Sequence, residues 1–198
     1  MAGEREIGWL DDIGQARKKA EETGKPILLY FHYKHCTGCK NTFERTLPKM
    51  SVIDAITENF VPVLLETSER PNDAATYSVD WTPTFIVADD TGLEITRWVG
   101  FLPEDDFLAQ LTMTRARAAM REHEYKNAER IFGEMIIKFP LTDLAAEAVY
   151  YRGVAKYKDT MNAEWLTRSY ENLKEGYPES TWALKASVWS REKMEKAA

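Results

Sequence analysis

The sequence predicts an α/β domain followed by an all-helical region, and three observations support this fold class. First, three apolar runs have the pattern of strands buried on both faces, as in parallel or mixed sheets: 27–31, 60–65 and 85–88. Second, a turn signal at 89–92 leads into residues 94–99, which alternate in polarity as a half-exposed strand does. Third, strand patterns vanish after Pro103, and the rest of the chain is rich in helix formers with spaced aromatics.

The first predicted element is a short amphipathic helix over residues 11–23. Ile13, Ala16 and Ala20 recur there at helical spacing among charged residues. Gly24-Lys25-Pro26 then stops the pattern, because glycine and proline are typical of helix ends. The strand 27–31 follows directly.

Two helical segments are expected between the first and the second strand. One runs from the two cysteines to about Leu47. Pro48 and a predicted N-cap at Ser51 separate it from a second helix over 52–59. A helical or irregular segment links the second and third strands, and the last two strands form an antiparallel hairpin at one edge of the sheet.

The helical region repeats itself at an offset of 38 residues. At this offset apolar residues coincide with apolar residues: Phe132 with Tyr170, Met135 with Leu173, Phe139 with Tyr177, and Ala148 with Ala186. Such recurrence is typical of stacked helix pairs. Over roughly 105–195 the pattern resembles tetratricopeptide repeats, although the period exceeds the usual 34 residues and several expected small residues are larger. The residues at the family's positions are Tyr150, Gly153, Tyr157, Leu166, Tyr170, Leu173 and Pro178, preceded by Ala128, Phe132, Met135 and Pro140.

The chain has two cysteines, Cys36 and Cys39, at a strand-to-helix junction. A disulfide scaffold has more cysteines, and a structural zinc site needs four ligands. A helix N-terminus favours the thiolate of Cys36, and Cys39, one turn later on the same face, can attack a mixed disulfide formed there. This pattern indicates redox chemistry. The alternatives are a buried pair without turnover, and half of a metal site with His32 and His35.

The segments around the cysteines resemble the thioredoxin fold, and more closely the DUF255-type branch of thioredoxin-like proteins. The resemblance covers about residues 7–111 and rests on these segments: 24–29, 36–39, 58–63, 69–71 and 81–85. It implies that Cys36 is the nucleophile and Cys39 the resolving thiol. It also implies that Pro83 is a cis proline opposite the sulfurs and that Thr82 lends backbone groups to a bound peptide. Trp81 is expected in the core or in the wall of the substrate cleft.

Four further positions are expected to modulate the site. Thioredoxins carry a buried acid six residues before the first cysteine, and here that position is Tyr30, so resolution is expected to be slow or to use another base. His35 replaces the usual Trp, and its imidazolium would favour the Cys36 thiolate and oxidant behaviour; a solvated loop residue is the alternative. Thr37 and Gly38 replace Gly-Pro and let the loop turn without bulk over the sulfur. The direction of electron flow stays open.

Composition and motifs exclude several classes of function. A net charge of −6 opposes binding to phosphate backbones, so no nucleic-acid partner is expected. No apolar run of about 18 residues occurs, so no membrane span is expected. We find no P-loop, Rossmann glycine pattern or carboxylate cluster, and predict neither a cofactor nor a metal. Residues 1–6 are charged on both signs without an apolar stretch after them, which predicts a cytoplasmic protein, or a periplasmic one if a signal was removed.

These observations predict a thiol-disulfide oxidoreductase of two domains. Residues 1–111 form the thioredoxin-like domain, and residues 112–198 form a TPR-like domain that binds a partner or client. The expected partners are protein or peptide disulfides and an external thiol reductant or oxidant. The alternative is a non-catalytic adaptor with a thioredoxin-like scaffold, in which the cysteines are a redox switch or a vestige.

Overall fold

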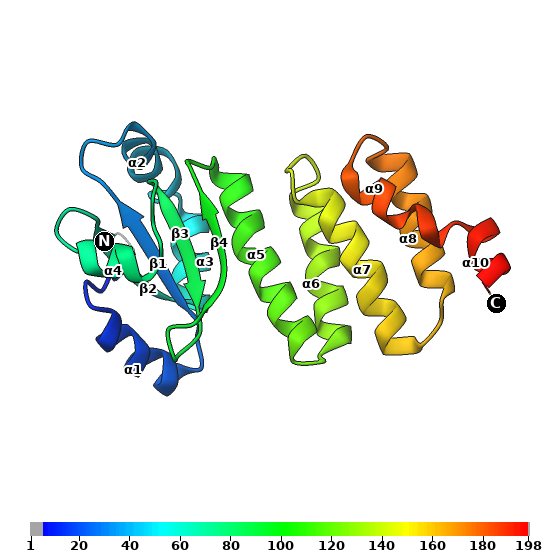
Figure 1. Cartoon of the computed structure of the whole chain (residues 1–198), viewed down its shortest axis with the longest axis horizontal. Helices are drawn as coiled ribbons and strands as arrows, with labels where there is room; N and C mark the ends of the chain where they lie inside the picture. Colours follow the sequence, from blue (N-terminus) through cyan, green and yellow to red (C-terminus); the bar gives the residue numbers. More distant parts are fainter. Residues whose placement is uncertain (1–5, 198) are drawn as a thin grey trace, which may run out of the picture. The chain divides into compact units, whose positions relative to one another are not determined.

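The computed structural model of the chain describes residues 6–197 (Figure 1). Residues 1–5, on which the predicted absence of a secretory signal rests, lie outside the described residues. The chain divides into two compact units between Leu108 and Ala109. This division lies inside the helix α5 (Glu104–Arg121), and the domain boundary predicted between residues 111 and 112 falls in the same helix.

The first unit is built on a mixed four-stranded sheet in the order β2-β1-β3-β4 (Figure 1). Its strands are β1 (Ile27–His32), β2 (Val61–Glu66), β3 (Thr84–Ala88) and β4 (Glu94–Val99). β1 pairs parallel with β2 and antiparallel with β3, and β3 and β4 form an antiparallel hairpin at the edge. The predicted α/β class and its edge hairpin are thus confirmed. The helical segments of this unit before α5 are α1 (Ile13–Thr23), α2 (Thr37–Asn41), the π-helix η1 (Thr42–Thr46), α3 (Met50–Asn59) and α4 (Pro71–Thr76).

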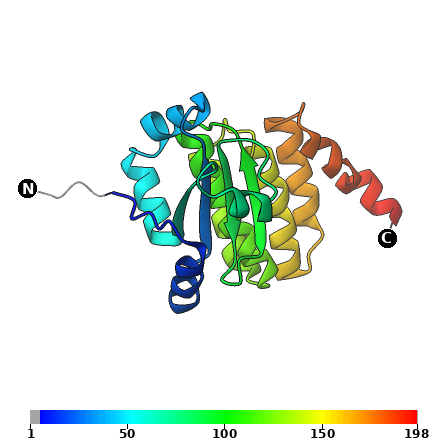
Figure 2. The same cartoon turned by 60° about the vertical axis from the view of Figure 1, so that its left-hand side comes forward.

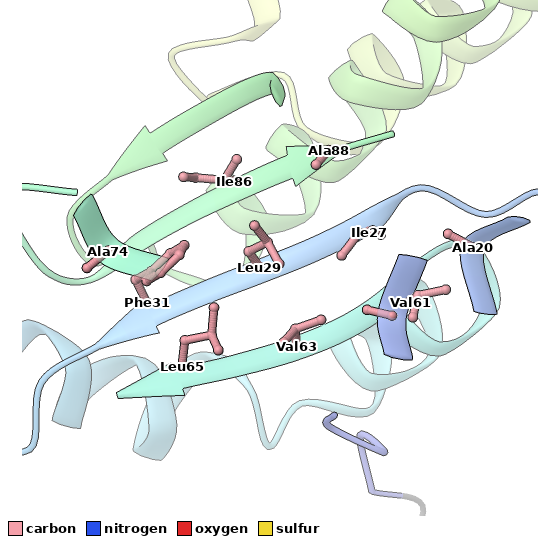
Figure 3. Close-up of a cluster of buried hydrophobic side chains, with 11 residues drawn as sticks. Ala20, Ile27, Leu29, Phe31, Val61, Val63, Leu65, Ala74, Ile86 and Ala88 are labelled. Carbon is pink, nitrogen blue, oxygen red and sulfur yellow. The ribbon is translucent and has the colours of Figure 1, made fainter. Parts of the chain in front are cut away.

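The central strand β1 is buried on both faces, as its continuous apolar run predicts. Because side chains alternate along a strand, Ile27, Leu29 and Phe31 share one face and pack in a core with β2, β3, α1 and α4 (Figure 3). Tyr30 points to the other face, where its ring stacks on Phe85 with 4.2 Å between centroids. On this second, aromatic face, the Tyr30 ring also contacts Phe43 of η1. Since η1 directly follows α2, this face of the sheet is covered by the segment that carries the cysteines.

α1 ends at Thr23 as the sequence predicts but begins at Ile13, two residues later than predicted, and its caps explain both ends. The Asp12 carboxylate accepts a hydrogen bond of 2.7 Å from the amide of Gln15, which satisfies one donor of the first turn. Gly24 ends the helix with φ of 69°, a left-handed conformation that glycine adopts without steric cost. Before the helix, Leu10 forms an isolated parallel bridge with Val63 beside β2, which the sequence analysis did not anticipate.

The helix predicted from the cysteines to Leu47 is divided into two parts. α2 runs for five residues and is followed by η1, in which the amide of Leu47 bonds to the carbonyl of Thr42 at 3.0 Å, one residue further back than in an α-helix. The buried Thr46 hydroxyl donates to the carbonyl of Leu102 at 2.6 Å. This contact ties the π-helix to a segment 56 residues away, and no local sequence pattern predicts it.

The predicted N-cap at Ser51 is wrong. α3 begins two residues earlier than predicted, at Met50, because Lys49 has the extended backbone of an N-cap, with ψ of 128°. Ser51 therefore lies in the first turn. Its hydroxyl donates to the carboxylate of Glu104 rather than capping the helix.

Within the described residues of the second unit, all the regular secondary structure is helical, as predicted. After α5, its elements are α6 (Tyr125–Lys138), α7 (Ala145–Thr160), α8 (Glu164–Gly176), α9 (Thr181–Ala186), the 3-10 turn η2 (Ser187–Trp189) and α10 (Arg191–Ala197). α6, α7 and α8 pack side by side (Figures 1 and 2). α6 and α8 end 38 residues apart, and the equivalent residues Met135 and Leu173 are both fully buried. Within residues 6–197, no helix is both long and apolar enough to cross a lipid bilayer.

Candidate active site

The site begins where β1 ends and the chain turns into α2. Cys36 is the N-cap of α2, with extended backbone angles of φ −88° and ψ 119°. Its Sγ accepts a hydrogen bond from the amide of Cys39 at 3.2 Å, in the way that a serine or aspartate side chain caps a helix. The amide of Cys36 donates to the carbonyl of Tyr33 at 3.0 Å, which closes the preceding turn. The sulfur thus faces backbone donors that favour a thiolate.

The two cysteines are close together but differently placed. Cys36 is partly exposed, whereas Cys39 is buried with 2% of its surface accessible. Both carry free thiols. A reagent or client in solution can therefore reach Cys36 first, and Cys39 lies within one helical turn behind it.

These surroundings shift the two thiols in opposite directions. Burial raises the pKa of Cys36, but hydrogen bonds from the Cys39 thiol and from the backbone amides of Cys39 and Gly38 outweigh it, so the pKa ends below that of an ordinary cysteine. Burial raises the pKa of Cys39, and its hydrogen bond to Cys36 raises it further. At neutral pH the proton is therefore held preferentially by Cys39, and the nucleophilic thiolate is favoured at Cys36.

Pro83 packs against this turn from the other side of the site. The Thr82–Pro83 peptide bond is cis. The Thr82 carbonyl accepts a hydrogen bond from the Cys36 thiol at 3.2 Å. A Cβ at Gly38 would lie 2.9 Å from Cδ of Pro83 and 3.7 Å from Sγ of Cys36. Only glycine therefore fits at position 38 without displacing the proline ring.

A surface pocket of about 590 Å³ opens beside the Cys36 sulfur. It brings together six of the residues that the sequence singles out: Cys36, Thr37, Gly38, Trp81, Thr82 and Pro83. Of the two expected positions for Trp81, core and cleft wall, the structure has the cleft wall, with 69% of the side chain exposed. An indole so exposed beside a reactive thiol offers apolar contact to a bound peptide.

Three predicted site residues do not line this pocket: Cys39, His35 and Tyr30. His35 is exposed, and its ring packs edge-on against Tyr33 with 5.4 Å between centroids. Tyr30 is fully buried beneath the cysteines, and its hydroxyl has no hydrogen-bond partner among the described residues. Burial, together with the neighbouring Cys39, raises the pKa of Tyr30 well above its ordinary value.

The histidine in β1 is a packing residue in this structure. His32 is partly buried, and its ring stands at 90° to that of Phe43 with 5.4 Å between centroids. Burial lowers the pKa of His32, although the nearby carboxylates of Glu66 and Glu69 oppose this. Among residues 6–197, no group of three or more His, Cys, Asp or Glu side chains is arranged to hold a metal ion.

The sequence analysis missed three apolar residues of the pocket wall: Tyr33, Val79 and Phe101. Tyr33 had a signal, because an aromatic in the loop three residues before Cys36 is well placed to flank the sulfur. Val79 and Phe101 had none, because the chain separates them from the cysteines by 40 residues or more. Only the folded loops bring them to the site.

A cysteine pair at a β1–α2 junction, facing a cis proline before β3 of a mixed sheet, defines the class of thioredoxin-like domains. The family model for the thioredoxin-like domain matches residues 13–114, and the chain belongs to this family. None of the curated proteins is significantly similar to the chain in sequence.

Several solved structures are similar to part of the chain. A DsbH oxidoreductase superposes with a TM-score of 0.51 at 15% identity, over 55% of this chain and 84% of that one. A thioredoxin from Thermus thermophilus has a TM-score of 0.47 at 28% identity, over 52% of this chain and 82% of that one. The C-terminal domain of DsbD from Neisseria meningitidis, in its oxidised form, has a TM-score of 0.46 at 20% identity, over 52% and 96% of the two chains.

Proposed function

We propose that this protein is a thiol-disulfide oxidoreductase that reduces or exchanges disulfides of protein clients through Cys36 and Cys39. The observation that carries the proposal is the contrast between the two thiols. Cys36 is partly exposed and caps α2, and its Sγ accepts a hydrogen bond from the amide of Cys39 at 3.2 Å. Cys39 is buried one helical turn behind it. An accessible thiolate with a protected second thiol within reach is the arrangement that two-step disulfide exchange requires.

In the first step, the Cys36 thiolate attacks one sulfur of a client disulfide. A bond forms between Cys36 and that sulfur, the client disulfide breaks, and the departing client thiolate takes up a proton. In the second step, Cys39 loses its proton to solvent and its sulfur attacks Sγ of Cys36. The 36–39 disulfide forms, and the second client sulfur leaves and is protonated. An external dithiol then reduces the pair, and running the same steps backwards oxidises a client.

The pocket residues supply the client site in this proposal. The backbone of Thr82 pairs with an extended client segment, while Trp81 and Pro83 contact its side chains. Gly38 leaves the sulfur uncovered, since a Cβ at position 38 would lie 3.7 Å from Sγ of Cys36. Thr37 contributes to the same tight turn. His35 modulates the reactivity of Cys36 from the exposed rim of the loop. Within the family, we place the chain in the DUF255-type branch on the segments that it shares with that branch.

We also propose that the helical region is TPR-like and holds a partner or client. Its support is the recurrence of buried positions at 38 residues and a pocket of about 510 Å³ lined by residues of α6, α7 and α8. Three cationic side chains lie at this pocket: Arg152, Lys156 and Arg168. Two of them, Lys156 and Arg168, flank the indole of Trp165, with cation-to-centroid distances of 3.9 and 4.8 Å.

Replacing each cysteine in turn tests the catalytic proposal. Cys36→Ser is expected to abolish reduction of a disulfide-bonded protein by dithiothreitol-coupled turnover, because no nucleophile reaches the client. Cys39→Ser keeps the nucleophile and is expected to accumulate client mixed disulfides on Cys36, visible by non-reducing electrophoresis. Equal turnover of the Cys36→Ser variant and the wild type would refute the proposal.

A further inference from the structure

The Tyr30 hydroxyl is a buried polar group that the proposed two-step exchange leaves without a role. The side chain is fully buried in β1, and its hydroxyl makes no hydrogen bond within the part of the chain that the structure describes. A buried hydroxyl without a partner destabilises the fold, and a phenylalanine at the same place would avoid this cost. We therefore look for a hydrogen-bond acceptor that this hydroxyl could reach in another protonation state of the site.

Two groups of the segment above the ring, the Cys39 thiol and the Thr42 hydroxyl, lie near enough to affect the pKa of this hydroxyl, although neither forms a hydrogen bond with it in this structure. Thr42 is itself buried and donates its proton to the carbonyl of Gly38 at 2.9 Å. That proton is therefore not available to a sulfur of the pair. Cys39 as a neutral thiol is a weak acceptor, but as a thiolate it is a strong one.

Resting on the proposed function, we propose that the Tyr30 hydroxyl donates a hydrogen bond to the Cys39 sulfur as it becomes a thiolate, and so speeds the resolving step. Tyr30 keeps its proton throughout. The proton of Cys39 passes to solvent, the Cys39 sulfur forms its bond to Sγ of Cys36, and the client sulfur leaves with the electron pair of the broken bond. Tyr30 stabilises the charge on Cys39 before that bond forms.

The other groups around Tyr30 do not replace this donor. The titratable groups that interact with or lie against it are Cys36 and Cys39 above the sheet and His32, whose ring is 5.7 Å away in β1 itself. The rings of Trp9, Phe43 and Phe85 cover the phenol on its other sides. Trp9 and the Phe rings have no hydroxyl, and His32 packs edge-on against Phe43. Among the aromatic side chains of this cluster, Tyr30 is the one that carries a hydroxyl.

Stopped-flow reaction of the reduced full-length protein with Ellman's reagent separates the two steps. Attack by Cys36 releases a first thionitrobenzoate, and resolution by Cys39 releases a second. We expect Tyr30→Phe to leave the first phase unchanged and to slow the second about tenfold at pH 7, with its pH midpoint moved up by about one unit. Tyr77→Phe is the matched control, because it removes a phenol of the same unit that donates to Gly92 at 3.0 Å, away from the cysteines.

The outcomes separate this inference from the proposed function. A second phase with the same rate and pH midpoint in Tyr30→Phe and the wild type would overturn the role of Tyr30. Equal slowing of both phases, or equal slowing by Tyr77→Phe, would overturn it too, because either would indicate a general structural effect. Failure of the wild-type protein to release any thionitrobenzoate would instead refute the proposed thiol chemistry itself.

Discussion

In the proposed disulfide exchange, Cys36 and Cys39 take different roles because their surroundings differ, although both are thiols. One sulfur caps a helix at the surface, and the other lies one turn inside. Hydrogen bonds from the Cys39 thiol and from two backbone amides favour the thiolate of Cys36, while burial favours the neutral thiol of Cys39. Under the proposed function, a client would meet the thiolate of Cys36 first, and the buried Cys39 would react only after a mixed disulfide had formed at Cys36.

The lowered pKa of Cys36 predicts how its alkylation depends on pH. Iodoacetamide reacts with the thiolate, so the rate falls as the pH drops through the pKa. We expect the midpoint for Cys36 to lie below that of a free cysteine, about 8.5, and therefore full reactivity to persist to lower pH. Cys39→Ala removes the thiol donor and is expected to raise this midpoint. Alkylation rates followed by mass spectrometry between pH 5 and 10 measure the midpoints of the wild type and of Cys39→Ala. A wild-type midpoint at or above that of free cysteine would contradict the lowered pKa of Cys36.

Gly38 is expected to tolerate no side chain. A Cβ at this position would lie 2.9 Å from the ring of the buried Pro83. Gly38→Ala should therefore push the proline away from the sulfur, cost about 1–3 kcal/mol of unfolding free energy and slow exchange with protein disulfides. The matched control is Gly8→Ala, where no atom lies within 4 Å of the added carbon. Thermal unfolding and turnover of both variants test this; wild-type behaviour of Gly38→Ala would show that the two turns do not pack as described.

At the scale of elements, the helical unit depends on one close approach between α7 and α8. A Cβ at Gly153 would lie 2.4 Å from Cβ of Ser169, whose hydroxyl donates to the carbonyl of Val149 at 2.9 Å. The glycine and the small serine let the two helix backbones come together, and the hydrogen bond ties them. The glycine that marks this position in the repeat pattern is therefore required by packing.

Two glycine-to-alanine variants in neighbouring helices test this packing. Gly153→Ala should lower the unfolding free energy of the helical unit by about 1–3 kcal/mol, because the added methyl group meets Ser169. Gly133→Ala in α6 meets only the flexible guanidinium of Arg152, at 3.4 Å, and should be neutral or stabilising by up to about 1 kcal/mol from helix propensity. Circular dichroism during thermal unfolding measures both, and equal midpoints for the two variants would contradict the predicted difference.

At the scale of the whole molecule, the chain joins a thioredoxin-like unit to a helical unit with a pocket of its own. In the proposed enzyme, the helical unit holds a client whose disulfide the first unit exchanges. In the alternative, an adaptor, binding is the function and the cysteines are dispensable. The two readings differ in whether partner capture depends on the thiols.

The variant with both cysteines replaced by serine separates these readings. Proteins captured by the full-length wild type and by Cys36→Ser/Cys39→Ser are compared by mass spectrometry under non-reducing conditions. We expect the double variant to lose the clients that bind through mixed disulfides. An unchanged set of captured proteins, together with no turnover by the wild type, would favour the adaptor.

Most strands and helices, and the place of the cysteine pair between β1 and α2, follow from local sequence patterns. The strand over 27–31, the end of α1 at Gly24 and the edge hairpin are local properties, because apolar periodicity and turn residues act within a few positions. The cysteines at a strand-to-helix junction are local in the same sense. The predicted N-cap at Ser51 was wrong, and the Ser51 hydroxyl instead forms a long-range hydrogen bond with the Glu104 carboxylate.

The assembly of the site depends on tertiary contacts between distant segments. The pairing of β1 with β3, the approach of Pro83 to Gly38, the π-helix bonded to Leu102 and the pocket wall at Phe101 all join segments far apart in the chain. The isolation of the Tyr30 hydroxyl beneath Cys39 belongs with them. Such contacts depend on which surfaces meet once the sheet is formed, and a pattern confined to neighbouring residues carries no information about them.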